Sequence, residues 1–150
     1  MEGRTIYGRQ KEMNDVITSL INQYEQKGDF NYATVTDEMI AEAENRLGVK
    51  LPEQYIDFIK KYGHGGIAGV ETMGVGLTGR LIFVETTLDY REEELPENLV
   101  VIENVDEYLT CIDCDTEKIV SWDFSGYIKE DYDSFDEYLL DQMNSAIENL

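Results

Sequence analysis

Two cysteines and one histidine are the residues of this chain whose types could support catalysis or metal binding. Cys111 and Cys114 have the CxxC spacing of redox-active and zinc-binding pairs. A tetrahedral zinc site needs four ligands, and His64 is the only other soft ligand in the chain, so zinc binding is disfavoured. A redox pair usually begins a helix, whose dipole lowers a thiol pKa, whereas these cysteines fall on a predicted strand and turn. We therefore expect neither a metal nor a cofactor.

The glycine-rich sequence around His64 invites a phosphate-binding or catalytic interpretation. A phosphate-binding loop follows a strand, opens a helix and ends in Lys followed by Ser or Thr, whereas this loop follows a predicted helix. A histidine-based triad would have to use His64, and no GxSxG motif accompanies it. We expect a structural loop in which the imidazole bonds backbone carbonyls, made of Gly63, His64, Gly65 and Gly66.

Alternating acids near the CxxC pair resemble the start of a calcium-binding loop. Asp113, Asp115 and Glu117 have the right spacing, but Lys118 stands where an EF-hand needs glycine. Phe124 occupies the position of the closing glutamate. The pattern instead predicts a hairpin turn at residues 115–117.

Four segments have the periodicity and end signals of helices. Residues 11–26 and 37–47 carry apolar stripes, and Thr36 is a good N-cap for the second. Pro52 suits the first turn of a third amphipathic helix, which Gly63 ends. Residues 135–148 follow Ser134, which forms a capping box with Glu137.

Short β-branched and aromatic runs dominate the chain after Val70. We expect strands in LIFVETT (81–87), LVVIENV (99–105), YLTCID (108–113) and KIVSWD (118–123). Val120 and Trp122 should share one face and pack in the core. Helices packed around an antiparallel sheet of four to six strands make an α+β fold.

The helix and loop from Leu51 to Ile67, LPEQYIDFIKKYGHGGI, resemble the SUKH (Smi/Knr-like) superfamily. The resemblance extends more loosely through the ENLVVIENV strand, the YLTCIDCDTEKIVSWD hairpin and the acidic last helix. It implies a single SUKH-like domain over residues 1–150. The best-known bacterial members of the superfamily are toxin-immunity proteins, many of whose toxins are nucleases, and other members have cell-wall or secretion-related roles.

Length and charge place independent limits on function. The 150 residues suffice for one domain with a packed core, and no apolar run spans a bilayer or forms a signal peptide, so the expected location is the cytoplasm. The net charge is −20: residues 1–88 hold 9 basic and 13 acidic side chains, whereas residues 89–150 hold 3 and 19. Such a field repels nucleic acid and anionic membranes and attracts a basic protein surface. Acidity can also serve solubility alone.

We therefore expect a binding protein without catalysis, an immunity protein that occludes a cognate bacterial toxin, and we expect that toxin to be a nuclease. A non-catalytic regulatory or scaffold adaptor is the alternative, and an enzyme using His64 or the glycine loop is a third class. The oligomeric state stays open. The residues expected to bind the partner are acidic except for one tyrosine: Asp113, Asp115, Asp123, Glu130, Asp131, Tyr132 and Asp133.

Overall fold

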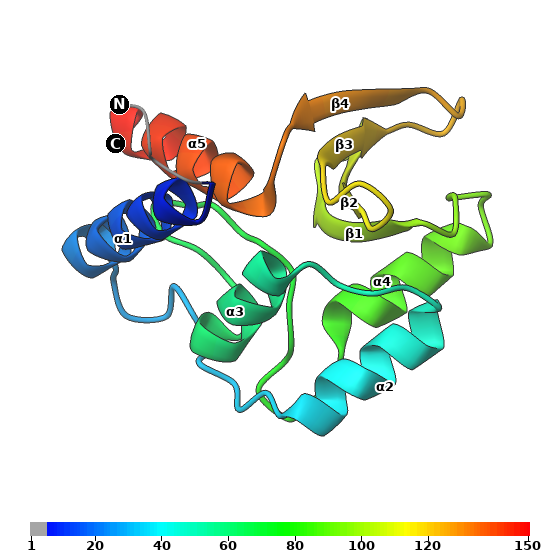
Figure 1. The fold of residues 1–150 in the computed structure, drawn as a ribbon, viewed down its shortest axis with the longest axis horizontal. Helices are drawn as coiled ribbons and strands as arrows, with labels where there is room; N and C mark the ends of the chain where they lie inside the picture. The colour runs from blue at the N-terminus through cyan, green and yellow to red at the C-terminus, as the bar shows by residue number, and fades with distance from the viewer. Residues whose placement is uncertain (1–5) are drawn as a thin grey trace.

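The computed structural model describes residues 6–150, which form helices and one antiparallel sheet (Figure 1). The helices before the sheet are α1 (Ile6–Tyr24), α2 (Asp37–Leu47), α3 (Glu53–Tyr62) and α4 (Ile82–Arg91). The strands are β1 (Leu99–Asn104), β2 (Leu109–Asp113), β3 (Ile119–Trp122) and β4 (Ile128–Tyr132), and α5 (Phe135–Glu148) ends the chain. The fold is α+β with a four-stranded sheet, as predicted.

The helices gather around two sides of the sheet. In Figure 1, α1 and α5 lie together on one side, α4 and α2 lie below the sheet, and α3 stands between the two groups. The strand order is β1-β2-β3-β4, so each strand pairs with its neighbours in the chain. One edge is β1, along which α4 packs, and the other edge is β4.

Helix ends follow the signals in the sequence. Thr36 accepts a hydrogen bond from Met39 N at 3.2 Å, and Gly48 ends α2 with a left-handed φ of 69°. Ser134 accepts one from Glu137 N at 3.2 Å. The Glu137 carboxylate reaches back to Asp133 N, also at 3.2 Å, which is one residue earlier than in the usual capping box. The predicted bounds of α2, α3 and α5 agree with the structure within a residue.

The two faces of the sheet belong to different apolar clusters. Val100, Ile112 and Ile119 are fully buried in the main core, which the helices also line. Val120 and Trp122 lie on the opposite face, in a second cluster with Cys111. The prediction that Val120 and Trp122 share a buried face is therefore confirmed, since Trp122 is 2% exposed.

The predicted strand at residues 81–87 is wrong, because this segment forms most of α4. Its β-branched residues favour strand geometry, but Phe83, Val84 and Thr87 also have helical spacing and all three are buried. Thr87 Oγ1 donates to Phe83 O at 2.7 Å and accepts from Val101 N at 3.0 Å, which ties the helix to β1. Packing against the sheet decides the conformation here.

One helix and one strand also differ from the predictions. The helix expected at 11–26 begins at Ile6 and ends at Tyr24. Strand β4 was not predicted, because its sequence IKEDY lacks an apolar alternation and its residues are exposed or half-buried. The antiparallel pairing of β4 with β3 stabilises this strand although its sequence pattern does not indicate one.

Candidate functional site

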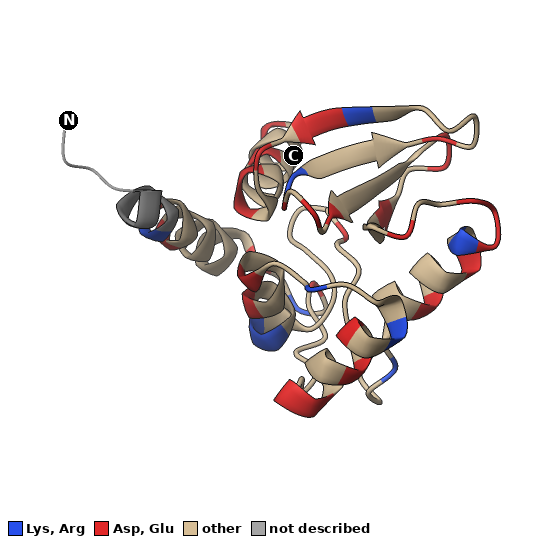
Figure 2. Cartoon of the chain, turned by 45° about the vertical axis from the view of Figure 1, so that its right-hand side comes forward, with Lys and Arg blue, Asp and Glu red and all other residues tan. Residues whose placement is uncertain are grey.

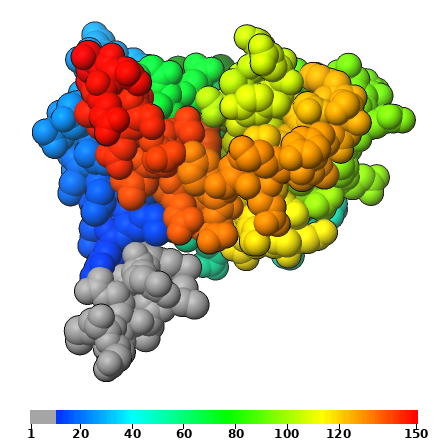
Figure 3. Space-filling model, turned by 90° about the horizontal axis from the view of Figure 1, so that it is seen from above, coloured from blue at the N-terminus to red at the C-terminus, as the bar shows by residue number. Residues whose placement is uncertain are grey.

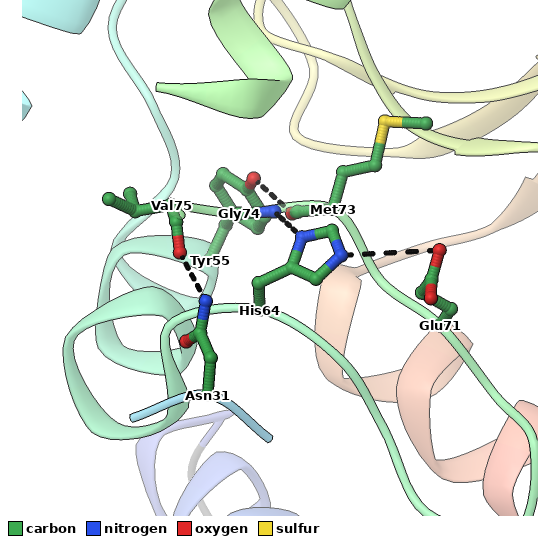
Figure 4. Close-up of polar contacts among 7 residues, drawn as sticks. All are labelled: Asn31, Tyr55, His64, Glu71, Met73, Gly74 and Val75. Carbon is green, nitrogen blue, oxygen red and sulfur yellow. Dashed lines mark hydrogen bonds and ion pairs between the residues drawn. The ribbon is translucent and has the colours of Figure 1, made fainter. Parts of the chain in front are cut away.

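The glycine-rich loop after α3 holds the only histidine of the chain between two other segments (Figure 4). His64 Nδ1 accepts a hydrogen bond from Gly74 N at 3.0 Å, and Nε2 lies 4.0 Å from a carboxylate oxygen of Glu71. The expected bond to a backbone carbonyl is thus reversed, because the imidazole accepts a backbone N–H. Both ring nitrogens face protein groups, an arrangement that serves the loop itself.

Glycine is required in this loop by the close approach of neighbouring backbone. A Cβ on Gly65 would lie 2.0 Å from Asp29 O, and one on Gly66 would lie 2.2 Å from Val70 O. Gly65 also pairs with Phe30 on one side and Thr72 on the other. The glycine loop is therefore an extended segment that lies between the segments containing Phe30 and Thr72, and glycine permits the close approach of these backbones.

The CxxC pair lies on β2 and the turn after it, as predicted, and both thiols are free. Burial raises the pKa of Cys111, and burial with the nearby Asp113 carboxylate raises the pKa of Cys114 to about 12. Thiols held in the protonated form are poor nucleophiles. Within the described residues, no group of three or more His, Cys, Asp or Glu side chains is placed to hold a metal ion, and no helix could cross a membrane.

A cavity of about 540 Å³ opens between the sheet and α5. Thr110 on β2 and Ser121 on β3 lie on its sheet side, and they alternate with the buried Cys111 and Val120. Around them stand four tyrosines and two aspartates, from the two turns at one end of the sheet, β4 and α5: Tyr108, Tyr127, Tyr132, Tyr138, Asp123 and Asp131. The cavity is named here the tyrosine cavity.

Carboxylates outside the tyrosine cavity hold two of its rings in place. Tyr138 donates to Glu103 at 2.8 Å, and Tyr132 donates to Asp141 at 2.5 Å. Burial, followed by the hydrogen bond to Asp141, raises the pKa of Tyr132 to about 12, so its hydroxyl stays protonated and donates. The rings of Tyr132 and Tyr138 meet edge to face at 5.9 Å.

The aspartates of the tyrosine cavity are also fixed by hydrogen bonds. Asp131 accepts one from Ser121 Oγ, and Lys129 Nζ lies 3.6 Å from its other oxygen. Asp123 accepts hydrogen bonds from the hydroxyl and the N–H of Ser125, which lower the pKa of Asp123. Both carboxylates are therefore presented in fixed positions.

A comparison with protein-family models matches residues 13–144 to a SUKH model described as SMI1-KNR4 cell-wall. The match covers most of the chain and includes the helix, glycine loop and sheet described above. The chain belongs to the SUKH family. The resemblance predicted from Leu51 to Ile67 and from the C-terminal half is confirmed.

The SUKH fold gathers most of the predicted partner-binding residues around β4. Asp123, Asp131 and Tyr132 line the tyrosine cavity. A second hollow of about 250 Å³ at the end of β4 is lined by acids and one tyrosine: Glu130, Asp131, Tyr132, Asp133 and Glu137. Figure 2 shows acidic residues at the end of β4 and over the start of α5. Five of the seven residues thus form one acidic region.

The other two predicted residues of this SUKH domain lie apart from the cavity. Asp113 is the last residue of β2 and Asp115 lies in the β2–β3 turn, at the end of β3 opposite to Asp123. Asp113 accepts hydrogen bonds from Asn98 Nδ2 at 3.0 Å and from Asp115 N at 2.9 Å. These contacts give Asp113 a turn-forming role.

Exposed apolar side chains gather at one end of the sheet, and two of them, Tyr108 and Tyr127, line the tyrosine cavity. The β1–β2 and β3–β4 turns lie at the same end of the sheet, because Asn104 pairs with Leu109 and Trp122 pairs with Ile128. The two turns and the first residue of β4 carry five of the exposed large apolar residues of the described chain: Val105, Tyr108, Phe124, Tyr127 and Ile128. Phe124 packs against Tyr90 and Trp122, and Ile128 pairs with Trp122, so these two side chains lie on the face of the sheet opposite to the cavity. Figure 3 shows β4 in orange, with the yellow-green residues of the first turn and α5 in red beside it. This end of the sheet therefore combines exposed apolar area with acidic charge.

Four residues that line the cavity were not predicted as site residues from the sequence: Tyr108, Tyr127, Tyr138 and Lys129. One signal was present, because Thr110 and Ser121 are polar residues at inward positions of otherwise apolar strands. A polar residue on the core face of a strand indicates that the face is open there. The four tyrosines come from separate turns and elements, so no spacing in the sequence connects them.

Proposed function

We propose that this SUKH protein is an immunity protein that binds a cognate bacterial toxin, a nuclease, and neutralises it by occlusion. The observation that carries the proposal is the acidic face around β4, where fixed carboxylates and tyrosine rings line one cavity at the end of the sheet that also carries exposed apolar turns. Interfaces rich in tyrosine with a central cavity are typical of tight protein binding. The role in toxin immunity is the one implied by resemblance to SUKH immunity proteins.

The charge of the protein supports a nuclease as the partner. A nuclease cleft is basic because it binds phosphates, so carboxylates can take the place of the nucleic-acid backbone. The net charge of −20 would steer such a partner and raise its association rate. Competition with nucleic acid inside the cell requires an affinity that is nanomolar or tighter, roughly −12 kcal/mol. No chemistry on the toxin is needed.

Affinity capture of the tagged protein from its own cells, at low and high salt, tests the proposal. We expect recovery of a nuclease, weaker capture at high salt, and inhibition of the purified nuclease at a one-to-one ratio. Capture of a cell-envelope or secretion protein, without inhibition of any nuclease, would instead support the adaptor alternative.

Two charge-reversed variants locate the interface once the partner is purified. Asp123→Lys with Asp131→Lys changes the acidic face, whereas Asp113→Lys with Asp115→Lys makes the same charge change at the β2–β3 turn. We expect the first pair to slow association about tenfold or more and to speed dissociation, while the second has only the long-range effect on association. Equal effects of the two pairs would remove the cavity from the interface.

A further inference from the structure

We propose that the tyrosine cavity binds one arginine side chain presented by the partner protein. The inference rests on the proposed function for the identity of the partner, but its first test needs only the protein and a small probe. It assigns a ligand to a preformed cavity and a role to Lys129, which lines the same cavity.

The electrostatics of the cavity favour a cation. Asp123 and Asp131 line the cavity directly. Glu103 and Asp141 lie behind two of the cavity tyrosines and accept hydrogen bonds from their hydroxyls. Four carboxylates therefore contribute negative potential to the cavity, and among the described residues Lys129 is the one lysine that lines it. An added positive charge is attracted by all four, and the partial burial of Asp131, whose side chain is 19% exposed, reduces screening by solvent.

The tyrosine rings add a second attraction that is selective for cations. A guanidinium over a tyrosine ring within about 6 Å is attracted by the negative face of the ring. Tyr132 and Tyr138 keep their positions through hydroxyl bonds to Asp141 and Glu103, so binding costs little side-chain entropy. The cavity volume of about 540 Å³ lies within the range of ordinary ligand pockets and exceeds what one side chain fills.

Lys129 shows that the cavity already accepts a positive group. Its ammonium lies 3.6 Å from Asp131, yet its side chain is 65% exposed and can turn outward into water. An arginine fork can form two parallel hydrogen bonds to the Asp131 carboxylate and stack on a ring, which a lysine ammonium cannot do. We infer that the arginine of the partner displaces Lys129 from Asp131.

The first experiment is an NMR titration of the full-length ¹⁵N-labelled protein with N-acetyl-arginine amide. N-acetyl-citrulline amide is the control, because it has the same shape without the charge. We expect saturable shifts of the amides of Thr110, Ser121 and Asp131 with the arginine probe and not with citrulline. Equal shifts with both probes, unsaturated shifts spread over the surface, or equal affinity for N-acetyl-lysine amide would overturn the proposal.

Two variants give changes of opposite sign that a purely structural role cannot produce. Asp131→Asn keeps an acceptor for Ser121 but removes the charge, and it should weaken binding about tenfold. Lys129→Met removes the competing ammonium and should tighten binding about threefold. Weaker binding by Lys129→Met would contradict the displacement.

Asp89→Asn is the matched charge control, because Asp89 is exposed on α4, which packs along the opposite edge of the sheet. Its affinity for the arginine probe should equal that of the unchanged protein. Arginine binding without any captured nuclease would support the cavity and contradict the proposed function. A captured nuclease without arginine binding would support the proposed function and contradict the arginine site. The failure of one proposal can therefore be distinguished from the failure of the other.

Discussion

The hydroxyl of Tyr138 on α5 donates a hydrogen bond of 2.8 Å to the carboxylate of Glu103 on β1. The two residues are 35 positions apart, and their bond joins the last helix to the first strand beside the tyrosine cavity. Burial raises the pKa of Glu103, and the hydrogen bond from Tyr138 acts in the opposite direction. One contact therefore supports both the packing of α5 and the charge of a half-buried carboxylate.

Tyr138→Phe should lower the free energy of unfolding by about 1–2 kcal/mol at pH 7, because it leaves the Glu103 carboxylate without its hydroxyl donor. Urea denaturation followed by circular dichroism measures the change. Tyr127→Phe is the matched control, since Tyr127 is 63% exposed, and it should change stability by less than about 0.5 kcal/mol. Equal losses in the two variants would mean that the bond contributes nothing specific.

Asp136→Asn should stabilise the protein at neutral pH. Asp136 is 5% exposed, and burial, with the nearby Asp57, raises its pKa from 3.8 to about 6. Its folded-state pKa is raised, so the stabilising contribution is fully present below pH 3.8 and is lost as the pH rises through about 6. The asparagine variant should be more stable by about 1–2 kcal/mol at pH 7 and lose this pH dependence.

Chemical denaturation of both proteins between pH 3.5 and 7.5, roughly the interval that brackets the two pKa values, tests this assignment. The stability difference between variant and original should be near zero at the acidic end and should grow through the interval. A difference that stays constant with pH would show that the amide acts through packing alone.

Gly74→Ala should destabilise the protein by about 3 kcal/mol or more, or prevent folding. A Cβ on Gly74 would lie 1.8 Å from the backbone oxygen of Gly63, so the glycine loop that contains His64 would have to move away from the segment of Gly74. Gly126→Ala is the matched control, because its φ of +89° is strained for alanine while its surroundings are open. It should cost only about 1 kcal/mol. Thermal unfolding of the two variants compares these costs, and similar losses would argue against a steric requirement.

Thr87→Val should lower the free energy of unfolding by about 1–3 kcal/mol. The substitution keeps the shape but removes the hydroxyl that accepts from the buried Val101 N. Thr87→Ser retains the hydroxyl and should keep more of the stability, losing only the packing of one methyl group. Hydrogen exchange of the Val101 amide provides a local measurement, because it should speed up in the valine variant only. Greater loss in serine than in valine would contradict the role of this bond.

The segments that could be predicted from the sequence are those whose local signals agree with their packing. Thr36 and Gly48 mark the two ends of α2 in the sequence itself. The apolar stripe of α3 ends at Tyr62, directly before the glycine that ends this helix. The alternation through Val120 and Trp122 placed both on one buried face. The strand predicted at residues 81–87 is wrong because β-branched side chains favour a strand locally, whereas the contact of Thr87 with β1 stabilises a helix.

The sequence by itself determined the α+β class, the ends of α2, α3 and α5, the glycine loop and the acidic C-terminal half, because each depends on neighbouring residues or on composition. Only the tertiary structure decided that β4 is a strand and that Tyr108, Tyr132 and Tyr138 surround one cavity. Strand pairing and cavity walls join residues from separate elements, and no local period records which elements will meet. The acidic charge was therefore visible in the chain, but its arrangement around β4 was a consequence of the fold.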